Sequence, residues 1–231
     1  MTVDKTAIRD AATVIVLRDR MTTPSVLMGQ RGAKAAFFPS KFVFPGGAVD
    51  ADDAGVPLVT PLSDICRSRL LEDSPADLSH ALSTAAIREL WEETGLLLGE
   101  PGQWPGTPHP DWERFAEAGY LPSALGMQFF FRALTPPGRP RRFDARFFLV
   151  DADRIEGDLD DFSAASEELS HLQWVPLAEA RALDLPFITE VVLAEVAACA
   201  RTLTPPPSIP FFKNDDEESL FLRLRGVAPV E

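Results

Sequence analysis

The chain has 231 residues, a formal net charge of −13, 45% hydrophobic residues and 25% charged residues. These proportions are typical of a soluble globular protein, and the length allows one substantial core with hardly any room for a second domain. We therefore predict a single domain over residues 1–231. The acidic balance argues against nucleic acid and against an anionic membrane as partners, because both require a basic face.

Cysteine usage and hydropathy indicate an intracellular protein. Cys66 and Cys199 lack the spacing of a metal or redox motif, so we expect them to be neutral thiols. No apolar run reaches the ~20 residues that span a bilayer, and the N-terminus lacks the pattern of a secretory signal. A cytoplasmic location is therefore expected.

The first third of the chain predicts a pair of strands followed by two adjacent glycines. Residues 12–17 are apolar and β-branched, and residues 26–31 are their expected hairpin partner. Gly46 and Gly47 follow, and adjacent glycines let a backbone pass close to a metal or a phosphate. Residues 62–72 predict a short helix.

A longer helix with a cluster of glutamates is predicted to end at Gly95. It is expected to begin at Ser74 and Pro75, which suit the N-cap and first positions of a helix. Near its end, three glutamates lie opposite an apolar stripe, where they repel each other and oppose the helix dipole. A hard divalent cation would resolve this conflict. The alternative interpretation is a solvated acidic face. The glutamates are Glu89, Glu92 and Glu93, and Arg88 is placed to brace Glu92.

The second half of the chain predicts more strands around an arginine-rich turn. Strands are expected at residues 127–134 and 143–150, and three arginines lie in the turn between them. Residues 99–110 are rich in proline and glycine and predict an ordered loop. A last strand at residues 172–177 leads to an amphipathic helix at residues 186–201. A C-terminal extension, about 202–231, is expected to pack as an edge strand or to form a homodimer contact.

The end of the acidic helix resembles the second half of the Nudix box. The motif R-E-U-x-E-E-x-G-U, in which U is aliphatic, is matched at every fixed position by Arg88-Glu89-Leu90-x-Glu92-Glu93-x-Gly95-Leu96. Upstream, Phe44-Pro45-Gly46-Gly47 resembles the strand and glycine pair that begin the box. The resemblance implies an α/β/α sandwich with a mixed β-sheet between helices.

The resemblance has one large departure. Five residues lie between Gly47 and Asp53, which stands where the motif G-x5-E-x7-R-E has glutamate. A further 34 residues separate Asp53 from Arg88, where the family has seven. We therefore predict an insertion inside the box, about residues 51–73, which a surface loop accommodates at little entropic cost. A split box of this kind resembles the coenzyme A diphosphatase branch.

The resemblance implies roles for individual residues. Glu89, Glu92 and Glu93 would bind Mg²⁺ or Mn²⁺, and Arg88 would support them. A catalytic base would come from Glu92, Glu93 or one of the pair Glu167 and Glu168, which precede the last strand. The expected substrate-binding residues are Arg31, Phe38, Gly46, Gly47, Arg141, Arg142 and Arg146.

Several of these residues also have a plain structural interpretation. Arg31 would then lie on the surface and Phe38 in the core. Guanidinium groups bind phosphate bidentately. Arg141, Arg142 and Arg146, at the strand expected over residues 143–150, also have acidic neighbours with which to pair. Those neighbours are Asp144, Asp151 and Asp153.

The expected activity is metal-dependent hydrolysis of a nucleoside diphosphate linked to another moiety, giving two monophosphates. Coenzyme A or acyl-coenzyme A is the first expectation for this small nucleotide-type partner, with ADP-ribose and NADH as alternatives. A hypothesis of another class is a Nudix-fold ligand-binding or regulatory module without catalysis. Such a module would be expected to have damaged metal carboxylates, and all three are retained here.

Overall fold

The computed structural model describes residues 7–214 and 219–226. Its strands are β1 (Ile8–Arg18), β2 (Ser25–Arg31), β3 (Phe42–Val43), β4 (Gly46–Ala48), β5 (Gly99–Pro101), β6 (Tyr120–Pro122), β7 (Gln128–Leu134), β8 (Arg142–Asp151), β9 (Leu169–Pro176), β10 (Ile209–Asn214) and β11 (Ser219–Leu224). The α-helices are α1 (Asp64–Leu71), α2 (Ser79–Thr94), α3 (Glu113–Glu117) and α4 (Phe187–Cys199). Short 3₁₀ turns lie at Ala51–Gly55, Pro110–Trp112, Ala152–Arg154 and Ala180–Ala182.

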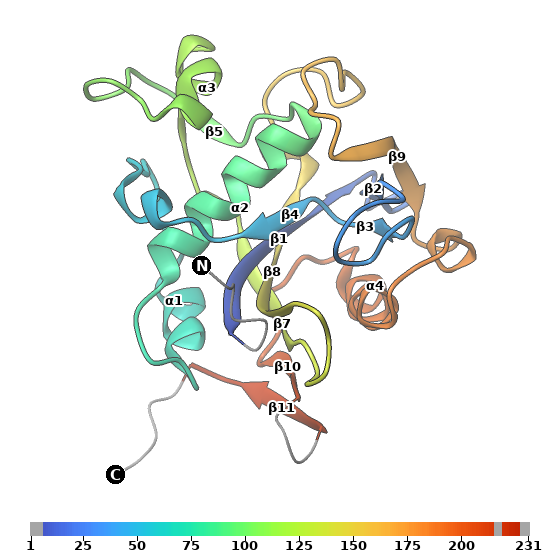
Figure 1. Cartoon of the computed structure of the whole chain (residues 1–231). Coiled ribbons are helices and arrows are strands. Elements are labelled where there is room, and N and C mark those ends of the chain that lie inside the picture. Colours follow the sequence, from blue (N-terminus) through green and yellow to red (C-terminus); the bar gives the residue numbers. More distant parts are fainter. Residues whose placement is uncertain (1–6, 215–218, 227–231) are drawn as a thin grey trace.

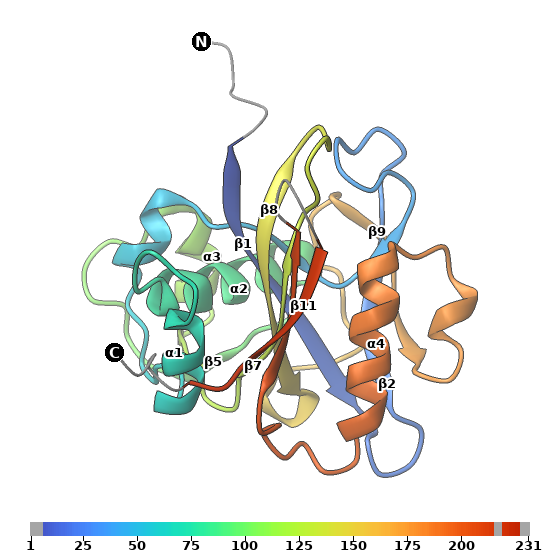
Figure 2. The same ribbon diagram turned by 90° about the horizontal axis from the view of Figure 1, so that it is seen from below.

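A nine-stranded mixed sheet lies between two layers of helices (Figures 1 and 2). The strand order is β11-β10-β7-β8-β1-β2-β3, with β4 also paired to β1 and β9 to β2. The pairs β1–β8 and β7–β10 are parallel, and the other pairs in the sheet are antiparallel. Helices α1, α2 and α3 lie on one side of the sheet and α4 on the other, which confirms the predicted α/β/α sandwich.

Strand β1 shows why both faces of the sheet are covered. Its even-numbered side chains from Ala12 to Val16 belong to the core beneath α2, while Ile15 and Leu17 belong to the core beneath α4. Successive side chains point to opposite faces of a strand, so an unbroken apolar run needs an apolar partner on each side. Among the described residues, no helix has the length and apolarity that crossing a membrane would require.

The predicted start of the long helix is wrong, and its predicted end is confirmed. Helix α2 begins at Ser79, whose backbone N–H and hydroxyl both donate to Asp77 Oδ1, at 3.0 and 2.6 Å. Ser74 lies in the turn before it. At the other end, Gly95 has a φ of +75° and its N–H donates to Trp91 O at 2.8 Å, which is the left-handed cap that glycine favours.

The predicted loop at residues 99–110 begins instead with strand β5. It pairs antiparallel with β6 in a separate two-stranded ribbon. Gly99 permits this pairing, because a Cβ at that position would lie 2.6 Å from the Leu121 carbonyl oxygen.

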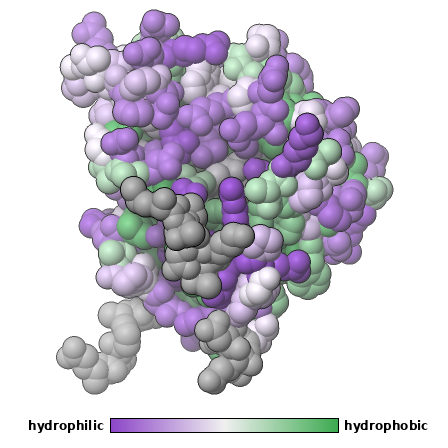
Figure 3. Space-filling view, in the orientation of Figure 1, coloured by the Kyte–Doolittle hydropathy of each residue, from purple (hydrophilic) through white to green (hydrophobic). Residues whose placement is uncertain are grey.

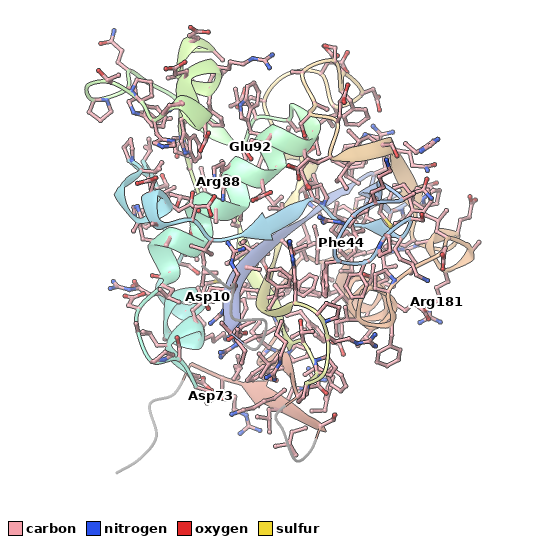
Figure 4. The ribbon with its side chains drawn as sticks, in the orientation of Figure 1. Asp10, Phe44, Asp73, Arg88, Glu92 and Arg181 are labelled. Atoms are coloured by element: carbon pink, nitrogen blue, oxygen red, sulfur yellow. The ribbon has the colours of Figure 1, made fainter. Side chains whose placement is uncertain are left out.

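The C-terminal hairpin, β10–β11, extends the sheet beyond β7 and confirms the predicted edge strand. Residues 215–218 and 227–231 of the predicted extension lie outside the described residues. The hairpin is fastened to the end of α1 by charged and polar contacts (Figure 4). Lys213 Nζ pairs with the Asp73 carboxylate at 2.6 Å, and the Glu72 carboxylate accepts hydrogen bonds from the N–H groups of Arg225 and Gly226.

Candidate functional site

The three glutamates of the Nudix-like motif lie in the last turns of α2, against the glycines of β4 (Figure 4 labels Arg88 and Glu92). Glu93 is 2% exposed, and its Oε2 accepts a hydrogen bond from the Gly46 N–H at 2.7 Å. A Cβ at Gly47 would lie 2.3 Å from Glu89 Oε1. The glycine pair therefore lets two carboxylates pack directly on the backbone.

Arg88 organises the cluster from within α2. Its Nη1 donates to Glu89 Oε1 at 2.9 Å and to Glu92 Oε2 at 3.2 Å. Its Nε and Nη2 donate to the two oxygens of Asp53, at 2.9 and 3.1 Å, and Nη2 also donates to the Ala48 carbonyl. Asp53 is 1% exposed, so the aspartate that stands in the place of the motif's first glutamate is a buried partner of Arg88.

Burial raises the pKa values of the three glutamates, so without a cation their charged form is disfavoured. Burial is the main cause that raises the pKa of Glu89 to about 7 and that of Glu93 to about 8, and the charge of Glu89 adds to the shift at Glu93. Burial also raises the pKa of Glu92. A cation bound among these side chains would offset the unfavourable burial of their charge.

The metal-free protein is expected to lose stability as the pH rises from about 5 to about 8. Glu89 and Glu93 retain protons in the folded state that they release in the unfolded chain, where their ordinary pKa is near 4.5, so stability falls with pH across this range. Glu93→Gln keeps an oxygen for the Gly46 N–H and should flatten the fall. The measurement is the thermal midpoint of each protein in EDTA at about pH 6 and pH 8.5. An equally large drop in midpoint for the variant and the wild type would contradict the prediction.

The donor set fits a hard divalent cation. Over residues 7–214 and 219–226, no three His, Cys, Asp or Glu side chains form a ready-made metal cage. Arg88 and the Gly46 N–H instead hold the glutamates individually. Mg²⁺ commonly takes only one or two protein carboxylates and fills its shell with water and substrate phosphate, so these glutamates suit it.

A cavity of about 460 Å³ opens beside the glutamates and runs towards α4. Glu89, Gly46 and Gly47 line one end of it, together with Arg31 and Glu168. In the space-filling view, hydrophilic surface dominates over α2, and hydrophobic surface gathers towards α4 (Figure 3). Within the cavity, Glu89 and Glu168 lie at its charged end, and Phe187, Ile188 and Phe212 supply apolar lining towards α4.

The loop before β9 places Glu168, rather than Glu167, at the cavity. The Ser166 N–H donates to the Glu92 carbonyl at 2.8 Å, which fixes this loop to the end of α2. Glu168 lines the cavity, and its negative charge contributes to the raised pKa of all three glutamates. Glu167 is exposed and is not part of the lining.

Arg31 and Phe38 both lie at the cavity. The Arg31 Nε is buried and has no hydrogen-bond partner within the described part of the chain, and the positive charge of Arg31 lowers the pKa of Glu93. Phe38 is half-buried, with its ring centroid 4.0 Å from that of Phe37. Their predicted roles in substrate binding remain predictions.

The three predicted phosphate-binding arginines have different surroundings. Arg141 is exposed and lines the cavity. Arg142 donates to the carbonyls of Thr135 and Asn214, at 3.1 and 3.3 Å, and does not line the cavity. The prediction for Arg146 is wrong. It is 1% exposed and pairs with Asp144 at 3.1 Å and with Asp10, so it binds neighbouring carboxylates, not substrate.

The cavity also contains residues that the sequence did not single out. Those with chemistry relevant to a ligand are Arg9, Arg139, Phe187, Phe212 and Asn214. Phe143 and Phe147 also line the cavity. For these two residues the two-residue alternation of a strand was a usable signal, because it places them on the opposite face of β8 from Arg142 and Arg146.

Comparison with known proteins identifies the family. The NUDIX domain model matches residues 76–196. The chain is 29% identical to the putative nudix hydrolase 7 of Caenorhabditis elegans, over 72% of this chain and 51% of that protein. It is 28% identical to the acyl-coenzyme A diphosphatase NUDT19 of Gallus gallus, over 54% of this chain and 47% of that protein.

A solved structure shows the same architecture. The NUDIX hydrolase from Alicyclobacillus acidocaldarius superposes with a TM-score of 0.62 and 28% identity, over 85% of this chain and 94% of that one. The present chain spans about half the length of the two curated relatives. The matched domain covers more than half of its residues. The chain belongs to the Nudix family.

Proposed function

We propose that this chain hydrolyses the phosphoanhydride bond of coenzyme A or an acyl-coenzyme A. The observation that carries the proposal is that Glu89 and Glu168 line a cavity of about 460 Å³ beside Glu92 and Glu93, and that the charge of Glu168 acts on all three glutamates of α2. Family membership supports diphosphate hydrolysis, and the likeness to the chicken acyl-coenzyme A diphosphatase supports the substrate class. The products would be adenosine 3′,5′-bisphosphate and a 4′-phosphopantetheine, acylated or free.

The residues at the charged end of the cavity have different proposed roles. When bound by Glu89, Glu92 and Glu93, Mg²⁺ or Mn²⁺ supplies charge neutralisation and a more acidic water. Arg88 holds two of these carboxylates, and the Gly46 N–H holds the third. Glu168 faces the cluster and is our proposed acceptor of the proton from the attacking water. Arg31 and Arg141 are the proposed ligands of the phosphate oxygens.

Product analysis tests the function directly. Purified protein with Mg²⁺ or Mn²⁺ is incubated in ¹⁸O-water with coenzyme A, an acyl-coenzyme A, ADP-ribose and NADH, and the products are identified by mass spectrometry. From the coenzyme A compounds we expect label in one of the two phosphate products, and no cleavage in EDTA. Preferred cleavage of ADP-ribose or NADH would overturn the substrate class. No cleavage of any compound would favour a ligand-binding module.

Glu168→Gln is expected to lower kcat by about 10²-fold or more, in the range of a lost general base. Glu167→Gln is the matched control, because it makes the same change one residue away, outside the cavity lining. Steady-state rates with Mg²⁺ measure both variants. Equal effects of the two changes would show that neither residue acts as the base.

Gly47→Ala is expected to abolish most of the activity. Its methyl group would lie 2.3 Å from Glu89 Oε1 and would displace that carboxylate. Gly32→Ala serves as the control, since a Cβ there meets no atom within 4 Å. Both rates are compared with the wild type after thermal melts confirm folding. Full activity of Gly47→Ala would show that the position of Glu89 is not critical.

A further inference from the structure

The cavity has more arginines than carboxylates in its lining, although the chain as a whole is acidic. Among the described residues, its carboxylates are Glu89 and Glu168, which belong to the charged end beside α2. The positive charge of Arg31 acts on Glu93 at the same end. The lining has three further arginines, whose positive charge favours an anionic ligand. They are Arg9, Arg139 and Arg141.

Strand register places these arginines at one edge of the cavity. Side chains alternate between the two faces of a strand, and the alternate residues Phe147, Ala145 and Phe143 of β8 all line the cavity. Arg141, directly before β8, continues this series and lines the cavity too. Arg9 of β1 comes to the same edge, because its registered partner is Phe143.

The side chains of Arg139 and Arg141 are available to a ligand. Within the described part of the chain, neither of them forms a hydrogen bond, an ion pair or a ring contact, and both residues are exposed. Arg9 has one distant partner, with 3.9 Å between its Nη2 and Asp50 Oδ1, and more than half of each side chain is exposed. An exposed pair of this kind is weak, so a phosphate could replace Asp50.

The distance from the glutamates shows that these arginines suit a different phosphate from the one near Arg31. From Ala48, next to Gly47, two strand spacings lead across β1 to Ala145, and four residues lead back along the chain to Arg141. This path separates the two backbones by about 16 Å. A long arginine side chain closes only part of that gap. The two phosphorus atoms of a diphosphate share one oxygen, so a single diphosphate is too compact to reach both places.

An aromatic surface lies between the two charged regions. Phe143 precedes Ala145 on the cavity face of β8, and the ring centroid of Phe37 lies 5.1 Å from that of Phe143. Phe38 continues this surface, with its centroid 4.0 Å from that of Phe37. Aromatic side chains suit the flat face of a nucleobase. An aromatic surface with positive charge on both sides therefore fits a nucleotide that carries phosphate at two positions of its ribose.

We propose that Arg139 and Arg141, together with Arg9, bind a phosphomonoester on the ribose of the substrate, separate from the diphosphate that is cleaved. This proposal rests on the proposed function, because it assumes that the diphosphate binds at Glu89. Coenzyme A carries such a group at its 3′ position, whereas ADP-ribose and NADH carry none. The arginines would therefore select coenzyme A compounds through a phosphate that the alternative substrates lack.

Two nucleotides that differ by one phosphate test this subsite. Adenosine 3′,5′-bisphosphate and AMP contain no diphosphate to cleave, so calorimetry with Mg²⁺ measures their affinities directly. The wild type is expected to bind the bisphosphate about tenfold more tightly. The double variant Arg139→Gln/Arg141→Gln should lose most of this preference, because glutamine is polar but uncharged. A wild type that binds both nucleotides equally, or binds neither, would overturn the proposal.

Kinetics with coenzyme A and 3′-dephospho-coenzyme A give a second readout. The 3′-phosphate lies away from the bond that is cleaved, so its absence should raise KM by about tenfold and change kcat little. The double variant should raise KM for coenzyme A by a similar factor and bring the kcat/KM values of the two compounds together. Equal KM values in the wild type, with both compounds hydrolysed, would support the proposed function and reject the subsite.

A second double variant controls for the loss of two positive charges. Arg114→Gln/Arg181→Gln changes two exposed arginines that do not line the cavity, and it should keep the preference for the bisphosphate. Thermal melts report the folding of both double variants. An equal loss of preference in the two would show that net charge, and not the subsite, attracts the second phosphate. An arginine-dependent preference without hydrolysis of any coenzyme A compound would support the subsite and reject the proposed function.

Discussion

Glu92→Gln is expected to reduce kcat by roughly 10³-fold while the thermal midpoint changes little. Glu92 is the most exposed of the three glutamates, with 34% of its side chain accessible against 12% for Glu89, so it contributes least to packing. Glutamine keeps the oxygen that accepts from Arg88 Nη1 but removes the charge that would bind a cation. Steady-state kinetics with Mg²⁺ and thermal melts give the two readouts.

A glutamate on α3 provides the comparison. Glu113→Gln removes the same charge from an exposed position that Arg88 does not contact, and it should leave kcat within a factor of two or so of the wild type. If Glu92→Gln unfolded the protein, Glu92 would be a structural residue. If it retained full activity, the proposed metal-binding role of the cluster would be rejected.

Arg88→Ala is expected to destabilise the fold by about 3–5 kcal/mol. The substitution would leave the carboxylate of Asp53 buried without its bidentate partner and would release Glu89 and Glu92 at the same time. Denaturant unfolding monitored by circular dichroism measures the loss. Activity should disappear as well, because the carboxylates lose the group that orients them.

Arg67→Ala is a matched control for this prediction. Arg67 also pairs with an aspartate through Nε and Nη2, but its side chain is 59% exposed and that of Asp77 is 34% exposed. An exposed pair contributes about 0–1 kcal/mol. Equal losses of unfolding free energy in the two variants would show that burial does not increase the contribution of the Arg88–Asp53 pair to stability.

Local patterns predicted those parts of the site that depend on a single element. The spacing of three glutamates before Gly95 identified the end of α2, because cap chemistry and carboxylate spacing are written in consecutive residues. The start of the same helix was misplaced because its cap depends on Asp77, which Arg67 of α1 helps to hold. Ser74 had the right chemistry without that partner.

Positions that depend on strand register were out of reach. The cavity brings together four alanines that are far apart in sequence and meet only because β1 pairs with β4 and β8, and β8 with β7. These are Ala11, Ala48, Ala133 and Ala145. Arg146 illustrates the same limit. Its sequence neighbourhood suggested phosphate binding, but the face of β8 on which it lies is decided by register, and that face is buried.

The contacts of Glu72 and Asp73 make two distant segments of the chain depend on each other. The segment that ends at Asp73 and the C-terminal hairpin both fall outside residues 76–196, yet Lys213, Arg225 and Gly226 bind these two acidic residues. In a chimera that exchanged only one of these segments with a relative, the polar groups of the other segment would lose their partners. The two segments should therefore be inherited together.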